Sequence, residues 1–323
     1  MAVMTMREAI SQALWEEMAR DERVFIMGEE VGVWGGTYAV TRGFHDHFGA
    51  DRVRDTPIAE GVIIGAANGA AMAGLRPVAE IMTINFALLA MDQIVNHSAK
   101  LRSMFGGQFT VPIVIRTVSG GGRQLGATHS QTPDVVFAHF PGLKVVAPGT
   151  PHDAKGLLKS AIRSDDPVMY IEHATLYQAR GEVPEEEYFE PIGVSKVQRE
   201  GDDVTLVSYS KGLQLSLQAA DILAKDNVFA EVVDLRSLRP LDMGPVVESF
   251  KRTNRCVIVE EGWGSFGIGA EVASRLYEAA FDYADAPIKR IAQEEVPLPY
   301  NRELEQMALP QVSDIVDAVK EVL

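Results

Sequence analysis

Glu60 is the residue whose type and surroundings point most clearly to chemistry. It is the only charged residue between Asp55 and Arg76, in a tract otherwise made of apolar and small side chains. Burial raises a carboxyl pKa by up to about 3–5 units, so such an acid can hold a proton near neutral pH. Proton-transfer catalysis needs an acid of this kind. The alternative is a structural ion pair between Glu60 and Arg54 or Arg76.

His129 is a second candidate for acid–base chemistry. It ends the glycine-rich loop SGGGRQLGATHSQ at 119–131, which follows a predicted strand. Histidine changes charge near physiological pH, and functional loops follow the strands of α/β proteins. The alternative is a surface histidine without a catalytic role.

The segment 262–267 fits the dinucleotide pattern G-x-G-x-x-G between a predicted strand and a predicted helix. Glu260 and Glu261 precede it and would repel a pyrophosphate. Trp263 and Phe266 fill its variable positions with bulky side chains. These features argue against dinucleotide binding and favour a simple tight turn between strand and helix. A nicotinamide-binding oxidoreductase is kept as the alternative from another functional class.

The elements that must position these residues alternate between strands and helices. A capping box at Thr5 and Glu8 starts the first helix, and the small residues after Glu60 predict another. Further helices are predicted at 88–102 and 153–163. Strands are predicted at 24–27, 78–84, 111–117, 144–148 and 168–171. This alternation predicts a mostly parallel sheet covered by helices.

The segment 177–203 interrupts the pattern, because it is rich in glutamate and poor in periodic apolar residues, and it suggests a linker. A second α/β unit follows it. Strands are predicted there at 204–208, 230–234, 256–260 and 288–291, and helices at 212–224, 245–251, 268–280 and 312–322. The fold class is α/β with two doubly wound units, and the predicted domains are 1–176 and 204–323.

Composition excludes several classes of function. The chain has 323 residues, 46% of them hydrophobic, and a formal net charge of −15. No segment concentrates Lys and Arg, so nucleic acid and anionic membranes are not expected as partners. The single cysteine, Cys256, cannot form an internal disulfide. With no secretory signal pattern, the expected location is the cytoplasm, or an organelle matrix after removal of a transit peptide.

Several long motifs resemble one family. They are DTPIAE at 55–60, AAMAGLRPVAEIMTINFALLAMDQIVNHSAK at 70–100, LGATHSQ at 125–131, DLRSLRPLD at 234–242 and VEEGWGSFGIGAE at 259–271. They resemble the beta subunit of the thiamin-diphosphate-dependent component of 2-oxoacid dehydrogenase complexes. MTINF resembles the pyruvate type, so pyruvate decarboxylation with transfer of the acetyl group to lipoyl is expected. Branched-chain 2-oxoacid and acetoin dehydrogenases remain alternatives, as does a non-catalytic scaffold subunit.

The resemblance implies roles for individual residues. It implies an N-terminal thiamin pyrimidine-binding domain and a C-terminal transketolase-like domain. Glu60 is expected to bond to N1′ of the cofactor's aminopyrimidine, and Phe86 to stack on that ring. Ile58 and Glu29 are expected to help bind the cofactor. His129 is expected to guide substrate or proton transfer around the lipoyl group.

The resemblance also implies partners. Mg²⁺ and the diphosphate are held in such enzymes by a GDG motif, which this chain lacks. An alpha subunit must then supply that half of the site, in an alpha2-beta2 heterotetramer. The acyltransferase of the complex, through its lipoyl domain and its basic peripheral subunit-binding domain, is the other expected partner. A structural K⁺ is expected on backbone carbonyls of Ile113, Ala161, Ile162, Ser164 and Asp166.

Overall fold

A computed structural model describes all of residues 1–323 and divides them into two compact units. The N-terminal unit comprises Met1–Ser119, Val136–Glu172 and Leu176–Ile192. The C-terminal unit comprises Gly120–Val135, His173–Thr175 and Gly193–Leu323. The glycine-rich loop with His129 thus belongs to the C-terminal unit, although it follows a strand of the other unit in sequence.

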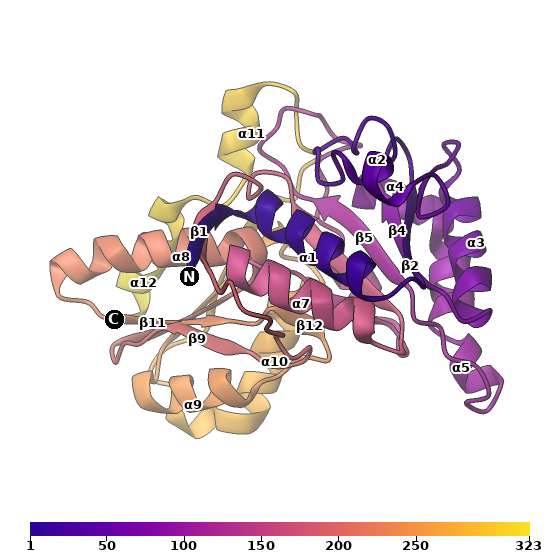
Figure 1. The fold of residues 1–323 in the computed structure, drawn as a ribbon. Helices are drawn as coiled ribbons and strands as arrows, with labels where there is room; N and C mark the ends of the chain where they lie inside the picture. Colours follow the sequence, from indigo (N-terminus) through magenta and orange to yellow (C-terminus); the bar gives the residue numbers. More distant parts are fainter. The chain divides into compact units, whose positions relative to one another are not determined.

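The N-terminal unit contains a parallel sheet with helices packed on it. The strands of this sheet include β2 (Val24–Gly28), β3 (Val53–Asp55), β4 (Arg76–Ile81), β5 (Val114–Ser119), β6 (Lys144–Val146) and β7 (Val168–His173). The strands β1 (Ala2–Thr5) and β8 (Arg180–Val183) form a separate antiparallel pair. The helices of the unit include α1 (Met6–Arg20), α2 (Phe44–Phe48), α3 (Glu60–Met72), α4 (Ile84–Ala87), α5 (Leu101–Met104) and α7 (Pro151–Arg163), and α6 (Asp134–Ala138) begins at the boundary between the units. The strand order β6-β7-β5-β4-β2-β3 brings β7, β5 and β4 together as neighbours. Helices α1 and α7 lie side by side over this sheet (Figure 1).

The local signals of the first helix are confirmed. The Thr5 side chain accepts a bond from Glu8 N at 3.2 Å, and the Glu8 carboxylate accepts one from Thr5 N at 2.7 Å. This reciprocal pair is the capping box, and it satisfies donors that a helix start leaves unbonded. The chain therefore enters α1 directly from β1.

The predicted continuous helix over 88–102 is wrong. The structure has a 3₁₀ turn, η1 (Leu88–Ala90), then a π-helical segment, η2 (Gln93–Ser98), and then the short α5. The carbonyl of Gln93 accepts bonds from the Asn68 side chain and the Ser98 hydroxyl, both at 3.0 Å. These side-chain donors compete with the regular helical bond, which explains the wide turn.

Two strand predictions were shifted. The strand predicted at 78–84 ends at Ile81, and Ile84 begins α4. Asn85 bonds to the hydroxyl of Thr83 at 2.6 Å, which favours a turn there. The strand predicted at 111–117 begins at Val114, because Pro112 has no N–H to donate to a neighbouring strand. The segment 177–203 contains β8, which pairs with β1, and β9 (Lys196–Arg199).

The C-terminal unit has its own sheet, in the order β14-β13-β10-β11-β9. Its strands are β9, β10 (Val204–Ser208), β11 (Ala230–Asp234), β13 (Cys256–Trp263) and β14 (Lys289–Gln293). The short strand β12 (Ser237–Arg239) is not part of this sheet. The helices are α8 (Ser210–Leu223), α9 (Gly244–Thr253), α10 (Ile268–Ala280), α11 (Arg302–Ala308) and α12 (Val312–Val322), with 3₁₀ turns η3 (Ala224–Asp226) and η4 (Phe281–Tyr283). No prediction was made for β12 or α11. Only β9 is antiparallel to its neighbour among the pairs β9–β11, β10–β11, β10–β13 and β13–β14.

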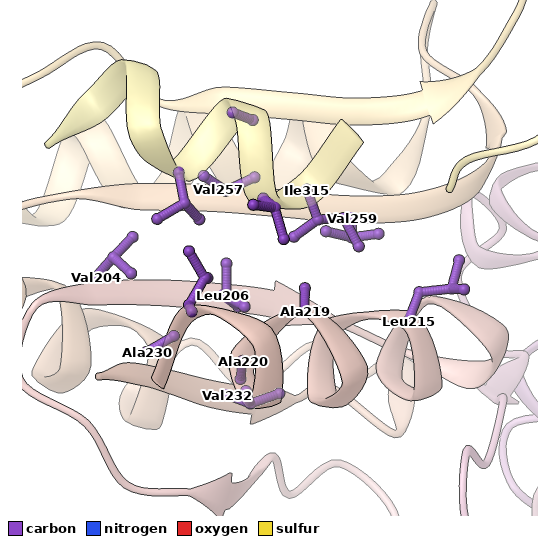
Figure 2. Packing of buried hydrophobic residues seen from close by; sticks show 14 of the residues in the cluster. Val204, Leu206, Leu215, Ala219, Ala220, Ala230, Val232, Val257, Val259 and Ile315 are labelled. Carbon is purple, nitrogen blue, oxygen red and sulfur yellow. The ribbon is translucent and has the colours of Figure 1, made fainter. Parts of the chain in front are cut away.

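The core of the C-terminal unit is made of aliphatic side chains from the sheet and from two helices. Val204 and Leu206 of β10, Ala219 of α8, Val257 of β13 and Ile315 of α12 belong to one buried cluster between the sheet and these helices (Figure 2). All five side chains are fully buried. Such a core holds the carboxyl ends of β10 and β13 in place. The glycine-rich turn 262–267 begins at the end of β13. No helix in the chain combines the length and apolar character needed to span a bilayer.

Candidate active site

Glu60 lies at the first position of α3, and only 5% of its surface is exposed. The burial expected for this side chain is confirmed. Its two candidate basic partners are occupied elsewhere: Arg54 pairs with Asp51 at 3.3 Å and Arg76 with Asp165 at 2.6 Å. The structural ion pair that was the alternative explanation for Glu60 is therefore not formed.

The small residues of α3 serve close packing inside the unit. A side chain at Gly61 would lie 3.5 Å from the carbonyl of Leu89, and one at Gly65 would lie 3.2 Å from the Gln93 side chain. These contacts bring η1 and η2 against α3. Val62, two residues after Glu60 on α3, remains 67% exposed, so its apolar side chain is accessible.

Glu29 directly follows β2, and it is close enough to Glu60 to be affected by its charge. One of its carboxylate oxygens, Oε1, is buried and has no hydrogen-bond partner. Burial raises the pKa of Glu29, and the nearby charges of Glu60, Glu30 and Glu80 raise it further. A buried oxygen without a partner costs free energy unless a ligand or water supplies one. Glu29 and Glu60 thus form a buried acidic pair in which Glu29 Oε1 can accept a bond from a polar ligand.

A buried network of charges includes Glu80, one of the acids that affect Glu29. Arg116 on β5 donates to the carboxylate of Glu80 on β4 and, through two nitrogens, to that of Glu172 on β7. The hydroxyl of Tyr177 donates to Glu172 as well. All four residues are at most 7% exposed. Because Glu80 and Arg116 are paired in register on adjacent strands, the network is fixed by the sheet itself.

The other two expected cofactor residues lie on either side of Glu60 in sequence. Ile58 is 81% exposed, in the turn that precedes α3. Phe86 lies on α4 and is half-buried, and its N–H bonds to the carbonyl of Thr83 at 3.0 Å. An exposed isoleucine and a half-buried aromatic ring offer apolar surface to a ligand or to another chain.

His129 belongs to the C-terminal unit, where it is exposed, and its ring nitrogen Nδ1 lies 2.9 Å from the Thr128 hydroxyl. Two buried carboxylates hold its loop. Glu261 accepts a bond from Gly121 N at 2.7 Å, and Glu305 accepts one from Gly122 N at 3.0 Å. Neither glutamate was predicted from sequence to hold this loop.

Glu261 is tied into the same unit by His173. The two side chains lie 2.9 Å apart. Burial alone would raise the pKa of Glu261, but His173 and the N–H of Gly121 outweigh it, and the pKa is lowered. The backbone of Gly120 lies against the His173 ring, so that a side chain there would lie 2.0 Å from Nε2. Glycine is thus required at position 120 for the loop to pass.

Glu260 fills the start of α10, the place that a pyrophosphate would need in a dinucleotide site. Its carboxylate accepts a bond from Gly269 N at 3.0 Å. Side chains at Gly267 or Gly269 would lie 2.5 or 2.6 Å from the same carboxylate. The glycines therefore make room for a glutamate of this chain, which argues against the nicotinamide-binding alternative.

The five carbonyls expected to hold K⁺ each accept a hydrogen bond from the protein. Arg76 donates to the carbonyls of Ile162 and Ser164, both at 3.0 Å. The carbonyls of Ile113, Ala161 and Asp166 accept from Val168 N, Ser164 N and the Ser164 hydroxyl. A carbonyl oxygen has two lone pairs, so one hydrogen bond does not by itself exclude a cation. The guanidinium of Arg76 nevertheless places a positive charge beside two of them.

Asp134 gives the C-terminal unit a pH-dependent stability. Its Oδ1 is buried without a hydrogen-bond partner. Burial, with the charges of Glu261 and Glu260, raises the pKa of Asp134 to about 8. The folded protein therefore keeps a proton between about pH 4 and pH 8 that the unfolded chain, with an Asp pKa of about 3.9, has lost. Its free energy of unfolding should fall as pH rises through this range.

We expect Asp134→Asn to flatten this fall, because the amide cannot ionise. Urea midpoints measured at several values from about pH 5 to 8.5 should decline less in the variant than in the unchanged protein. Some decline should remain, since burial raises the pKa of Glu260 to about 7. Asp282→Asn, at an exposed position, is the control. Equal slopes in the Asp134 variant and the unchanged protein would contradict the assignment.

Comparison with known proteins shows the family. Residues 2–180 match the model of the transketolase pyrimidine binding domain, and residues 193–315 match that of the transketolase C-terminal domain. The chain is 50% identical over 318 residues to the pyruvate dehydrogenase E1 component subunit beta of Rickettsia felis, with 98% of each chain covered. It is 50% identical over 322 residues to the mitochondrial protein of that name from Dictyostelium discoideum, with 98% of this chain and 90% of the relative covered.

A solved structure supports the fold. The split gene transketolase described as an inactive beta4 tetramer superposes with a TM-score of 0.81, over 99% of this chain and 98% of that one. Its sequence identity is 24%, so the likeness concerns the fold alone. The predicted fold class, two transketolase-like α/β units, is confirmed.

Proposed function

We propose a function for this chain as a member of the family of pyruvate dehydrogenase E1 component beta subunits, the family to which its full-length identity to those proteins assigns it. It is the beta subunit of a thiamin-diphosphate-dependent pyruvate dehydrogenase. With an alpha subunit it catalyses the oxidative decarboxylation of pyruvate and the reductive acetylation of lipoyl groups. The observation that carries the proposal is the buried pair of Glu60 and Glu29, which has no basic partner and leaves Glu29 Oε1 without a bond.

The residues of the pair suit the pyrimidine half of thiamin diphosphate. When bound, the cofactor supplies a nucleophilic carbon that attacks the carbonyl of a 2-oxoacid. Glu60 would hold a proton at the ring nitrogen N1′, for which a desolvated carboxyl group is suited. Glu29 would help to hold the same ring, and Phe86 and Ile58 would offer it apolar surface.

His129 would act on the substrate side. His129 is exposed, and two buried carboxylates hold its loop, so a partner could bind against a histidine that is already in position. Its imidazole nitrogens can accept or donate a proton, and so could pass one to or from a lipoyl sulfur. This role depends on the acyltransferase partner, whose lipoyl domain would bring the acceptor, and whose basic subunit-binding domain would meet this acidic chain.

The diphosphate half of the site would come from the alpha subunit. This chain has no GDG motif for Mg²⁺, which prefers oxygen ligands shared with phosphates. An alpha2-beta2 heterotetramer would then join the two halves. K⁺ on the carbonyls beside Arg76 would be structural, and it would have to tolerate the nearby guanidinium.

Cofactor binding tests the divided site. We expect calorimetry to detect tight, Mg²⁺-dependent binding of thiamin diphosphate to the assembled heterotetramer, and only very weak binding to this chain alone. The alpha subunit alone is the matched control. Tight binding by the isolated beta chain would show that the diphosphate ligands lie in this chain after all.

Substrate comparison tests the reaction itself. The reconstituted heterotetramer should turn over pyruvate with a higher kcat/KM than 2-oxoisovalerate or acetoin. A preference for 2-oxoisovalerate would indicate a branched-chain enzyme, and a preference for acetoin would indicate an acetoin dehydrogenase. Either result would replace the substrate but keep the cofactor, whereas no turnover of any of them would argue for the scaffold alternative.

A further inference from the structure

A histidine and two carboxylates converge in the N-terminal unit, at the start of α7. His152 and Asp153 belong to the first turn of this helix, and Glu190 belongs to the segment that follows β8. One ligand atom from each lies within 4.8 Å of the other two. The Asp153 side chain is fully buried, and those of His152 and Glu190 are 26% and 17% exposed. An ion could therefore reach this group from solvent.

The distances fit a shared metal ion better than direct hydrogen bonds. His152 Nδ1 lies 3.5 Å from Asp153 Oδ1 and 3.5 Å from Glu190 Oε1. Hydrogen bonds between nitrogen and oxygen are shorter, about 2.7–3.2 Å. Two ligands of a tetrahedral ion with bonds of about 2.0–2.2 Å are separated by roughly 3.3–3.6 Å. Both separations from His152 Nδ1 match this value, and the oxygens of Asp153 and Glu190 lie within 4.8 Å of each other.

Other residues of the unit hold the three side chains in this arrangement. Thr150 donates its hydroxyl to Asp153 Oδ2 at 2.7 Å, and Asp153 Oδ1 lies 3.5 Å from His152 Nδ1. The Tyr188 ring stacks on His152 at 4.7 Å, and its hydroxyl donates to the His152 carbonyl at 2.8 Å. Second-layer bonds of this kind orient metal ligands.

Gly156 makes room for Glu190. A side chain at position 156 would lie 2.6 Å from Glu190 Cγ and 2.9 Å from the Tyr188 ring. Ser160, one turn later on α7, donates its hydroxyl to the Glu190 carbonyl at 2.6 Å. The Glu190 segment is therefore fastened to α7 by two contacts beyond the three candidate ligands.

We propose that His152, Asp153 and Glu190 bind one divalent transition-metal ion of the Zn²⁺ class, with water as the fourth ligand. Imidazole nitrogen suits Zn²⁺ and its neighbours in the first transition row, whereas Mg²⁺ and Ca²⁺ prefer sites made only of oxygen. The two carboxylates balance the charge of the ion. This site is separate from the acidic pair of Glu60 and Glu29, and its role is to fasten the Glu190 segment to α7.

Zn²⁺ titration of the chelator-treated, full-length chain tests the proposal, with excess Mg²⁺ present. We expect one Zn²⁺ per chain, and a visible absorption band of tetrahedral Co²⁺ when Co²⁺ replaces it. His152→Ala and the nearly isosteric Glu190→Gln should each weaken Zn²⁺ binding by about tenfold or more. Gly156→Ala should weaken it as well, by displacing Glu190. His97→Ala is the matched control, because His97 lies 3.6 Å from the carboxylate of Asp92 and is much more exposed.

Three results would overturn the proposal. The first is the absence of stoichiometric Zn²⁺ binding by the unchanged chain. The second is equal affinity in the unchanged chain and in both the His152 and Glu190 variants, which would indicate adventitious surface binding. The third is an equal loss of affinity in the His97 control. Thermal unfolding of each variant without metal shows whether it is folded. If His152→Ala is unfolded, the Zn²⁺ affinity of Glu190→Gln decides whether the site exists.

Discussion

Glu60→Gln in the assembled enzyme is expected to reduce the rate of pyruvate decarboxylation by about 10²–10⁴-fold, the usual contribution of a proton-transfer group. The amide has nearly the same shape as the carboxyl group, so the packing at the start of α3 should survive. It cannot hold and release a proton, however. Because Glu60 has no basic partner in the structure, the substitution leaves no buried cation unpaired.

The rate should be measured with an artificial electron acceptor, so that only decarboxylation is followed, at saturating thiamin diphosphate. Glu22→Gln, an exposed acid of the same unit, is the control and should keep full activity. Circular dichroism and thermal unfolding should be the same for all three proteins. Activity of the Glu60 variant within a factor of about three of the unchanged enzyme would remove Glu60 from the proposed mechanism.

Glu60 could be found from sequence because a lone acid in an apolar tract is a local signal. The helix that follows it, the capping box at Thr5 and the strand 204–208 were predictable for the same reason, since their patterns lie within a few residues. Arg116 carried a similar signal, as a lone charge in the apolar run VPIVIRTVS, but its partners were not identifiable. Glu80 and Glu172 are far from it in sequence, and only the strand order brings them together.

The parts that sequence could not predict depend on contacts between distant residues. The Gln93 carbonyl accepts hydrogen bonds from the side chains of Asn68 and Ser98, and a π-helical turn forms where an α-helix was predicted. The glycine-rich loop is held by Glu305, whose carboxylate lies far along the chain. Helix α11 had a local signal, since Asn301 caps it by accepting a bond from Glu303 N at 2.9 Å. Its role in holding the loop required the structure.

Arg116→Met is expected to destabilise the protein more than any other single substitution considered, by about 3–5 kcal/mol or more. The guanidinium is 2% exposed and pairs with both Glu80 and Glu172, so its loss leaves two carboxylates buried without a cation. Burial already raises the pKa of Glu80 even with Arg116 present. Without the arginine, both acids must take up protons or draw water into the sheet.

Urea unfolding, or the soluble yield if the variant does not fold, measures the loss. Arg54→Met is the matched control, because its pair with Asp51 is 54% and 99% exposed, and it should change stability by less than about 1 kcal/mol. Adding Glu80→Gln and Glu172→Gln to Arg116→Met should recover part of the loss, since no buried charge then remains. If Arg116→Met is as stable as the Arg54 control, the buried ion network contributes little to the stability of the protein. If the triple variant is no more stable than Arg116→Met, the cost lies in lost packing of the guanidinium and not in unpaired carboxylates.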